Sequence, residues 1–226
     1  MIKENLEQIR SQIDEAAQAA GRPADAVRLI AVSKTKPLAL IEEAVAAGQM
    51  DFGENRVQEL VDKQAALPDV RWHMIGVLQR NKVKYIAPFI HLIHSVDSTR
   101  LLQEINKRAG QHERRIAVLL QIDITGEVQK AGMALEEARE ILQQIESYPH
   151  IEVKGLMGMA EFTSDMQRVK SQFRKLKEAA EALQDLCGER ISMDELSMGM
   201  SGDFAEAIAE GSTMVRVGSA IFGHRG

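Results

Sequence analysis

The chain opens with an amphipathic pattern and then alternates between short apolar runs and longer helical ones. Ile2, Leu6, Ile9 and Ile13 recur at steps of three and four residues, which predicts a helix over residues 2–20. Eight apolar runs with the composition of β-strands follow, at 28–33, 50–53, 70–75, 92–96, 116–122, 151–157, 195–198 and 214–217. Helical patterns lie between them, at 37–47, 54–67, 80–86, 99–109, 135–147, 164–186 and 204–210.

This alternation predicts parallel strands joined by helical crossovers. Runs such as 29–32 and 116–120 are apolar on both faces, as expected of strands covered by helices. Eight such units after a first helix predict an α/β fold, a (β/α)8 TIM barrel with an extra N-terminal helix. The competing open, doubly wound sheet normally has a glycine-rich turn after its first strand, and residues 33–36 contain no glycine. Because no linker-like segment interrupts the chain, we expect residues 1–226 to form a single domain.

The overall composition excludes several classes of protein. With 45% hydrophobic and 27% charged residues, the 226-residue chain is expected to be globular. Its net charge of −5 and its aromatic content of 4% argue against a nucleic-acid partner. No apolar run approaches the ~20 residues of a membrane helix, and the N-terminus lacks the pattern of an export signal. We therefore expect a cytoplasmic protein with no membrane or nucleic-acid partner.

The histidines and the single cysteine form no metal-binding motif. Cys187 alone cannot build a thiolate cluster, and it fits a reducing compartment. The six histidines show neither H-x-x-x-H nor H-E-x-x-H spacing, so no metal site is predicted for His73, His91, His94, His112, His150 and His224. His73 lies within an apolar run and is expected to be a hydrogen-bonded core residue.

Candidate ligand-binding residues are expected at the carboxyl ends of the strands, where barrels bind their ligands. Lys34 ends the first run and has the strand parity of Ile30 and Val32. If that face points inward, the amine lies at the barrel mouth, where desolvation lowers its pKa and makes it nucleophilic. The alternative is that the flexible side chain carries its charge to solvent. Lys36 is a rival, although it precedes Pro37 and is expected in the loop.

Two turns after the seventh and eighth strands predict a phosphate site. Barrel enzymes usually bind phosphate there, together with the N-terminus of a short extra helix. Gly218 allows close approach to the backbone, and Ser219 adds a hydroxyl at the start of a short apolar segment. Ser197 and Ser201 offer further donors, and Met200 in the same turn is a further expected contact. The alternative is that these small residues only shape the turns.

Arg216 has the parity of Met214 and is expected to point into the barrel. There its guanidinium can bind a phosphate or face a ring nitrogen, and an internal ion pair with Glu54, Asp97 or Asp123 is an open alternative. A lysine, an arginine and a phosphate cradle together suggest pyridoxal 5′-phosphate (PLP), held as a Schiff base. A permanently charged arginine at the ring nitrogen keeps that nitrogen unprotonated and weakens the cofactor as an electron sink.

Several segments carry a family resemblance: Ala-Val-Ser-Lys-Thr-Lys-Pro at 31–37, Phe-Gly-Glu-Asn at 52–55, Trp-His-Met-Ile-Gly at 72–76, Ser-Met-Gly-Met-Ser at 197–201 and Gly-Ser-Thr-Met-Val-Arg-Val-Gly at 211–218. In this order they resemble the pyridoxal phosphate homeostasis proteins, relatives of the barrel domain of alanine racemase, over nearly the whole chain. The resemblance implies a single-domain barrel that binds PLP through Lys34, with Arg216 at the ring nitrogen. It also implies that Asn55 lies near the cofactor and that the phosphate is bound by Ser197, Ser201, Gly218 and Ser219.

The resemblance further implies a carrier or regulator of the intracellular cofactor pool with no established turnover. We therefore expect a monomer that buffers or delivers PLP, has no catalytic residue, and meets PLP-dependent apo-enzymes as transient partners. One alternative is a PLP-dependent amino-acid racemase or related enzyme, and another is a barrel enzyme acting on phosphorylated sugars. Racemisation needs acid–base groups on both faces of the ring, and alanine racemases bring a tyrosine from a second domain of a partner subunit. Here Tyr85 and Tyr148 are the only tyrosines, and neither is expected at the mouth.

Overall fold

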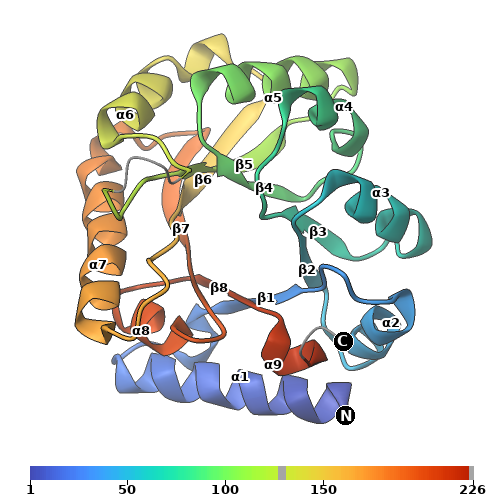
Figure 1. Ribbon diagram of the computed structural model, residues 1–226. Coiled ribbons are helices and arrows are strands. Elements are labelled where there is room, and N and C mark those ends of the chain that lie inside the picture. Colours follow the sequence, from blue (N-terminus) through green and yellow to red (C-terminus); the bar gives the residue numbers. More distant parts are fainter. Residues whose placement is uncertain (127–130, 224–226) are drawn as a thin grey trace.

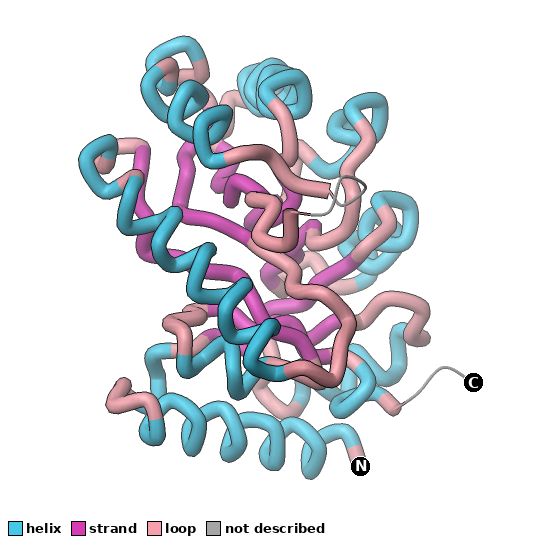
Figure 2. The backbone as a smooth tube through the Cα atoms, turned by 60° about the vertical axis from the view of Figure 1, so that its left-hand side comes forward, coloured by secondary structure: helices cyan, strands magenta, loops and turns pink. Residues whose placement is uncertain are grey.

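Eight parallel strands close into a barrel in the part of the chain that the computed structural model describes, residues 1–126 and 131–223. The strands form the inner layer, and the helices surround them (Figures 1 and 2). Each strand pairs with the next, and the last pairs with the first, which closes the sheet. The strands are β1 (Arg28–Val32), β2 (Asp51–Glu54), β3 (Arg71–Met74), β4 (Leu92–Val96), β5 (Ile116–Gln121), β6 (Ile151–Met157), β7 (Ile191–Met200) and β8 (Met214–Val217).

The outer layer consists of helices that bury one apolar stripe each against the strands. The helices are α1 (Ile2–Ala19), α2 (Leu38–Ala46), α3 (Val57–Ala66), α4 (Val83–Ile86), α5 (Thr99–Gln111), α6 (Leu135–Gln143), α7 (Met166–Ala182), α8 (Phe204–Ala209) and α9 (Ser219–Phe222). None of the described helices is long and apolar enough to cross a membrane.

Helix α1 confirms the predicted extra helix before the first strand. It buries Ile2, Leu6, Ile9 and Ile13, the residues whose spacing predicted it. It runs beside α8 and α9 (Figure 1), so it packs against elements from the other end of the chain. The amide of Asn5 donates a hydrogen bond to the carbonyl of Ile221 at 2.8 Å, which ties α1 to α9 beside the barrel mouth.

The strands separate two apolar layers. Leu29 and Ala31 face outward into the main core between strands and helices, whereas Ile30 faces the barrel interior. The interior cluster consists of Ile30, Leu92, Leu119, Met157 and Met214. Since successive strand residues point to opposite faces, any residue with the parity of Ile30 also faces inward.

The structure confirms the predicted (β/α)8 barrel, but two element boundaries differ in ways that matter for function. Strand β7 covers Ile191–Met200 rather than 195–198. The apolar run alone missed its first part, because half-exposed Ser192 and exposed Asp194 alternate there with buried Ile191 and Met193. Helix α3 begins at Val57 rather than at residue 54, which leaves Asn55 in the loop at the barrel mouth.

Candidate functional site

A cavity of about 720 Å³ opens at the carboxyl ends of the strands, where the sequence predicted a ligand site. It is bordered by the loops after β1, β2, β6, β7 and β8. Ser197 lies beneath it, inside β7, and its side chain is fully buried. The predicted cofactor residues that line the cavity are Lys34, Asn55, Met200, Ser201, Arg216, Gly218 and Ser219.

The direction of the Lys34 side chain follows from the alternation of inward and outward side chains along β1. Ile30 and Val32 face the interior and the cavity, and Lys34 continues this parity with a half-buried side chain that lines the cavity. Ser33 has the opposite parity, and its hydroxyl donates to Glu54 Oε1 at 2.6 Å. The next residue, Thr35, has a φ of 62°, an unfavourable conformation for a β-branched residue. Such strain persists only where the surroundings enforce it, so the Lys34 turn must be held by other contacts.

Those contacts form a buried cluster on the outer side of the turn, which we call the Lys63 clamp: Ser33, Glu54, Glu59 and Lys63. The Lys63 ammonium donates to the Ser33 carbonyl at 2.7 Å, to Glu54 Oε1 at 2.7 Å and to Glu59 Oε1 at 2.6 Å. The Thr35 amide also donates to Glu59 Oε1, at 2.5 Å. The clamp therefore holds the backbone on both sides of Lys34.

The Lys63 clamp was not predicted from the sequence. Lys63 looks like half of an ordinary surface pair with Glu59, four residues earlier on the same helix. The available signal was its position on the buried stripe of α3, in register with Val57 and Leu60. The Glu54 carboxylate is fully buried, and burial raises its pKa, although the hydrogen bonds from Lys63 and Ser33 act in the opposite direction.

Lys36, the rival of Lys34, also lines the cavity. Its ammonium donates to the carbonyl of Gly223 at 2.9 Å, which draws it toward the end of α9. The two lysines therefore approach the same cavity from different environments.

Arg216 points into the barrel, as its parity with Met214 predicted, and is 4% exposed. Its Nη1 donates to Ser197 Oγ at 2.5 Å and its Nη2 to the Gly158 carbonyl at 3.2 Å. Burial lowers the pKa of Arg216 to about 10, and the negative charge of Asp203 partly offsets this effect. The guanidinium therefore remains charged at neutral pH.

The ion pairs left open for Arg216 are not formed. Glu54 belongs to the Lys63 clamp outside the barrel. Asp97 accepts from Ser98 at 3.3 Å, and Asp123 accepts from Thr125. Arg216 is instead bound by neutral acceptors, and its face toward the cavity is open to a ligand.

Two hydroxyls and a glycine, which follow β7 and β8, form another part of the cavity rim. Ser219 Oγ donates to Ser201 Oγ at 3.3 Å, so the two side chains lie together at the cavity edge. A Cβ at Gly218 would lie 3.0 Å from the Val32 carbonyl oxygen, so a side chain here would require β1 to move by a few tenths of an ångström. Helix α9 begins at Ser219 and is the short extra helix that the sequence predicted after the eighth strand.

Asn55 is positioned by close contact between its own backbone and that of Gly76. A Cβ at Gly76 would lie 2.5 Å from the Asn55 carbonyl oxygen, so the loop after β3 packs directly on the loop after β2. The side chain of Asn55 is half-buried and lines the cavity.

The arrangement brings together three kinds of group. A primary amine can condense with a carbonyl compound, a buried guanidinium can donate to an acceptor, and paired hydroxyls with an accessible backbone suit an anion. A ligand that carries an aldehyde, a ring acceptor and a phosphate would satisfy all three at once.

Among the described residues, the nearest approach to a metal-binding cluster lies at the opposite end of the barrel. Ligand atoms of Asp51, His73 and His91 lie within 4.8 Å of one another. Asp51 is already paired with Arg71, and both ring nitrogens of His73 have hydrogen-bond partners. His224 lies outside the described residues.

Comparison with known proteins identifies the family of this chain. The family described as "Alanine racemase, N-terminal domain" matches residues 5–226. A pyridoxal phosphate homeostasis protein of Pseudomonas aeruginosa is 42% identical over 226 residues, covering 99% of this chain and 96% of that protein. The solved structure of PipY from Synechococcus elongatus without PLP has a TM-score of 0.88 at 39% identity, with 99% of this chain and 100% of that chain covered. PipY with PLP bound gives a TM-score of 0.86 at 38% identity and the same coverage.

This chain therefore belongs to the alanine racemase N-terminal domain family and, within it, to the pyridoxal phosphate homeostasis proteins.

Proposed function

We propose that this protein binds PLP as a Schiff base on Lys34 and carries or buffers the cofactor, without robust catalytic turnover. The observation that supports this most is the single cavity shared by Lys34, the buried Arg216 and the Ser201–Ser219 pair. The structure of PipY with PLP bound supports the same ligand. In this proposal the protein acts as a monomer in the cytoplasm and meets PLP-dependent apo-enzymes transiently.

The residues present fit PLP. When bound, the cofactor supplies an electrophilic aldehyde and an electron-withdrawing ring. Lys34 would provide the amine and Ser201, Gly218 and Ser219 would hold the phosphate. Asn55 and Met200 line the same cavity. Ser197 contributes indirectly, because its hydroxyl accepts from Arg216 below the cavity.

Arg216 supports a carrier rather than an enzyme that stabilises carbanions. Its guanidinium donates hydrogen bonds and stays charged at neutral pH, so a ring nitrogen facing it must act as an acceptor. An unprotonated ring nitrogen withdraws electrons weakly. The site therefore favours holding the aldehyde over removing an α-proton from an amino acid.

The placement of the tyrosines also favours a carrier over the racemase alternative. Tyr148 is buried before β6, at the amino end of that strand. Tyr85 lies on α4 and is about half exposed, with Lys82 and Lys84 over its ring. Neither tyrosine lines the cavity, so neither supplies a second acid–base group within this chain.

Proton exchange separates the carrier from the racemase. Purified protein mixed with PLP is expected to develop the visible absorption of a Schiff base. In deuterium oxide, however, it should exchange the α-proton of alanine no faster than free PLP at the same concentration. Exchange at enzymatic rates, roughly 1–10³ s⁻¹, would establish the racemase instead. Protein that develops no visible absorption with PLP would favour a phosphate-sugar enzyme.

A further inference from the structure

A continuous line of polar side chains crosses the barrel interior below Arg216. The nitrogen and oxygen atoms of neighbouring members lie 2.5–3.0 Å apart: Arg216 Nη1 to Ser197 Oγ 2.5 Å, Ser197 Oγ to His94 Nδ1 2.8 Å, His94 Nε2 to His73 Nδ1 2.9 Å, and His73 Nε2 to Asp51 Oδ1 3.0 Å. All five residues are buried, and they come from β8, β7, β4, β3 and β2.

The chemistry of the two ends fixes the direction of every hydrogen bond in this line. Arg216 can only donate, so Ser197 Oγ accepts from it and uses its own hydrogen toward His94 Nδ1. His94 then carries its proton on Nε2 and donates to His73 Nδ1. His73 in turn carries its proton on Nε2 and donates to the Asp51 carboxylate.

The opposite direction is excluded by the carboxylate. If His94 donated to Ser197, His73 would donate to His94 through Nδ1. A neutral His73 would then place the lone pair of Nε2 against Asp51, 3.0 Å away. Both histidines are fully buried, and burial lowers the pKa of each. Two neutral Nε2–H rings therefore satisfy every atom in the line.

We propose that Ser197, His94, His73 and Asp51 form a one-directional hydrogen-bond relay that orients the Arg216 guanidinium and couples it to the opposite end of the barrel. These four are positioning residues, since they act through Arg216 and do not touch the cavity. Only the expected effect of the relay on PLP binding rests on the proposed function.

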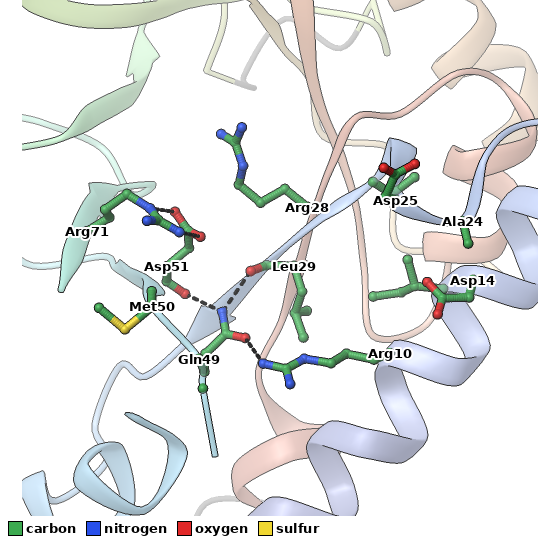
Figure 3. Close-up of a pocket in the computed structure, with 13 residues that line it drawn as sticks. Arg10, Asp14, Ala24, Asp25, Arg28, Leu29, Gln49, Met50, Asp51 and Arg71 are labelled. Carbon is green, nitrogen blue, oxygen red and sulfur yellow. Dashed lines mark hydrogen bonds and ion pairs between the residues drawn. The ribbon is translucent and has the colours of Figure 1, made fainter. Parts of the chain in front are cut away.

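The far end of the relay reaches a second cavity, of about 310 Å³, whose lining includes Asp51 and Arg71. Arg71 holds Asp51 through two hydrogen bonds, at 2.8 and 2.6 Å, and Gln49 contacts the Asp51 backbone (Figure 3). Burial raises the pKa of the Asp51 carboxyl, but the hydrogen bonds from Arg71 and His73 and the positive charge of Arg71 outweigh this effect and lower the pKa below its ordinary value. Asp51 is thus a fixed negative charge that anchors the relay beside solvent-exposed Arg71.

The relay can be tested first without any cofactor. Nitrogen-15 NMR of the unloaded protein is expected to show His73 and His94 as neutral Nε2–H tautomers, with a scalar coupling between His94 Nε2 and His73 Nδ1 across their hydrogen bond. Exposed His112, which is not a member of the relay, provides the reference signal in the same spectra. An Nδ1–H tautomer at either buried histidine would overturn the relay.

Two serine variants then test whether the relay acts on Arg216. Ser197→Ala removes the acceptor of Arg216 Nη1 and should weaken PLP binding roughly ten-fold and shift the visible absorption. Ser212→Ala is the matched control, because Ser212 is equally buried but donates to backbone carbonyls, including that of Met198 at 2.8 Å. Equal effects of the two variants on PLP binding would contradict the proposal.

A third variant tests the coupling over distance. Asp51→Asn should shift the His94 and Arg216 guanidinium resonances of the unloaded protein, although residue 51 lies at the other end of the barrel. Unchanged resonances would contradict the relay. If the relay is present but the wild-type protein takes up no PLP, the proposed function fails while the relay stands.

Discussion

Lys34→Ala is expected to leave a folded barrel that no longer forms a Schiff base with PLP. The side chain is half-buried at the cavity and makes no hydrogen bond among the residues that the structure describes, so the variant should keep its thermal stability. Its affinity for PLP, measured by equilibrium dialysis, should fall on the order of 100-fold, or roughly 2.7 kcal/mol. The visible absorption of the bound cofactor should disappear.

Two further substitutions test whether PLP binding depends on the covalent bond to Lys34. One keeps the positive charge at residue 34, and the other removes the neighbouring lysine, Lys36. Lys34→Arg keeps a positive charge at the mouth but presents a guanidinium that does not condense with an aldehyde, so it should behave like Lys34→Ala. Lys36→Ala should retain the absorption, because Lys36 is drawn toward Gly223. A Lys34→Arg protein that still turns yellow with PLP would contradict the assignment.

Lys63→Met is expected to cause the largest loss of stability. It removes the ammonium that compensates the fully buried Glu54 carboxylate and releases the Ser33 carbonyl. Breaking a buried ion pair on one side typically costs about 3–5 kcal/mol of unfolding free energy. Urea denaturation at neutral pH should show this loss, whereas Lys175→Met on the exposed face of α7 should change little.

The stability lost in Lys63→Met should depend on pH, because it involves the ionisation of Glu54. Burial raises the pKa of Glu54, so the folded protein binds this proton more tightly than the unfolded chain does. The contribution of Glu54 to stability is therefore most favourable in acid and falls as the pH rises through its folded pKa. The deficit of Lys63→Met should shrink on acidification, and Glu54→Gln in the same protein should restore part of the stability. A deficit independent of pH and of Glu54→Gln would show that lost packing, not charge, is the cause.

The sequence predicted the fold and the mouth of the barrel because both depend on local periodicity. Strand–helix alternation predicted the barrel, and strand parity alone predicted that Lys34 and Arg216 point inward. Ser201, Gly218 and Ser219 lie where barrel geometry places them, directly after β7 and β8.

What the sequence did not predict depends on contacts between distant strands. Ser197 was expected at the rim because its strand was predicted to end at residue 198. The strand continues to Met200, which leaves Ser197 three residues inside, under Arg216. Its partner His94 is 103 residues away, and no local pattern joins the two. His73 was expected to be a hydrogen-bonded core residue, but its partners follow only from the register of the closed barrel.

The central claim is that the Lys34 amine is the group that holds PLP, and borohydride trapping tests it most directly. The protein is incubated with PLP, reduced with borohydride and digested, and fragment-ion spectra locate the added pyridoxyl phosphate group. The account predicts a single modified residue, Lys34, with Lys36 unmodified in the same peptide. Modification of Lys36 or of a lysine outside the cavity, or no modification at all, would contradict it.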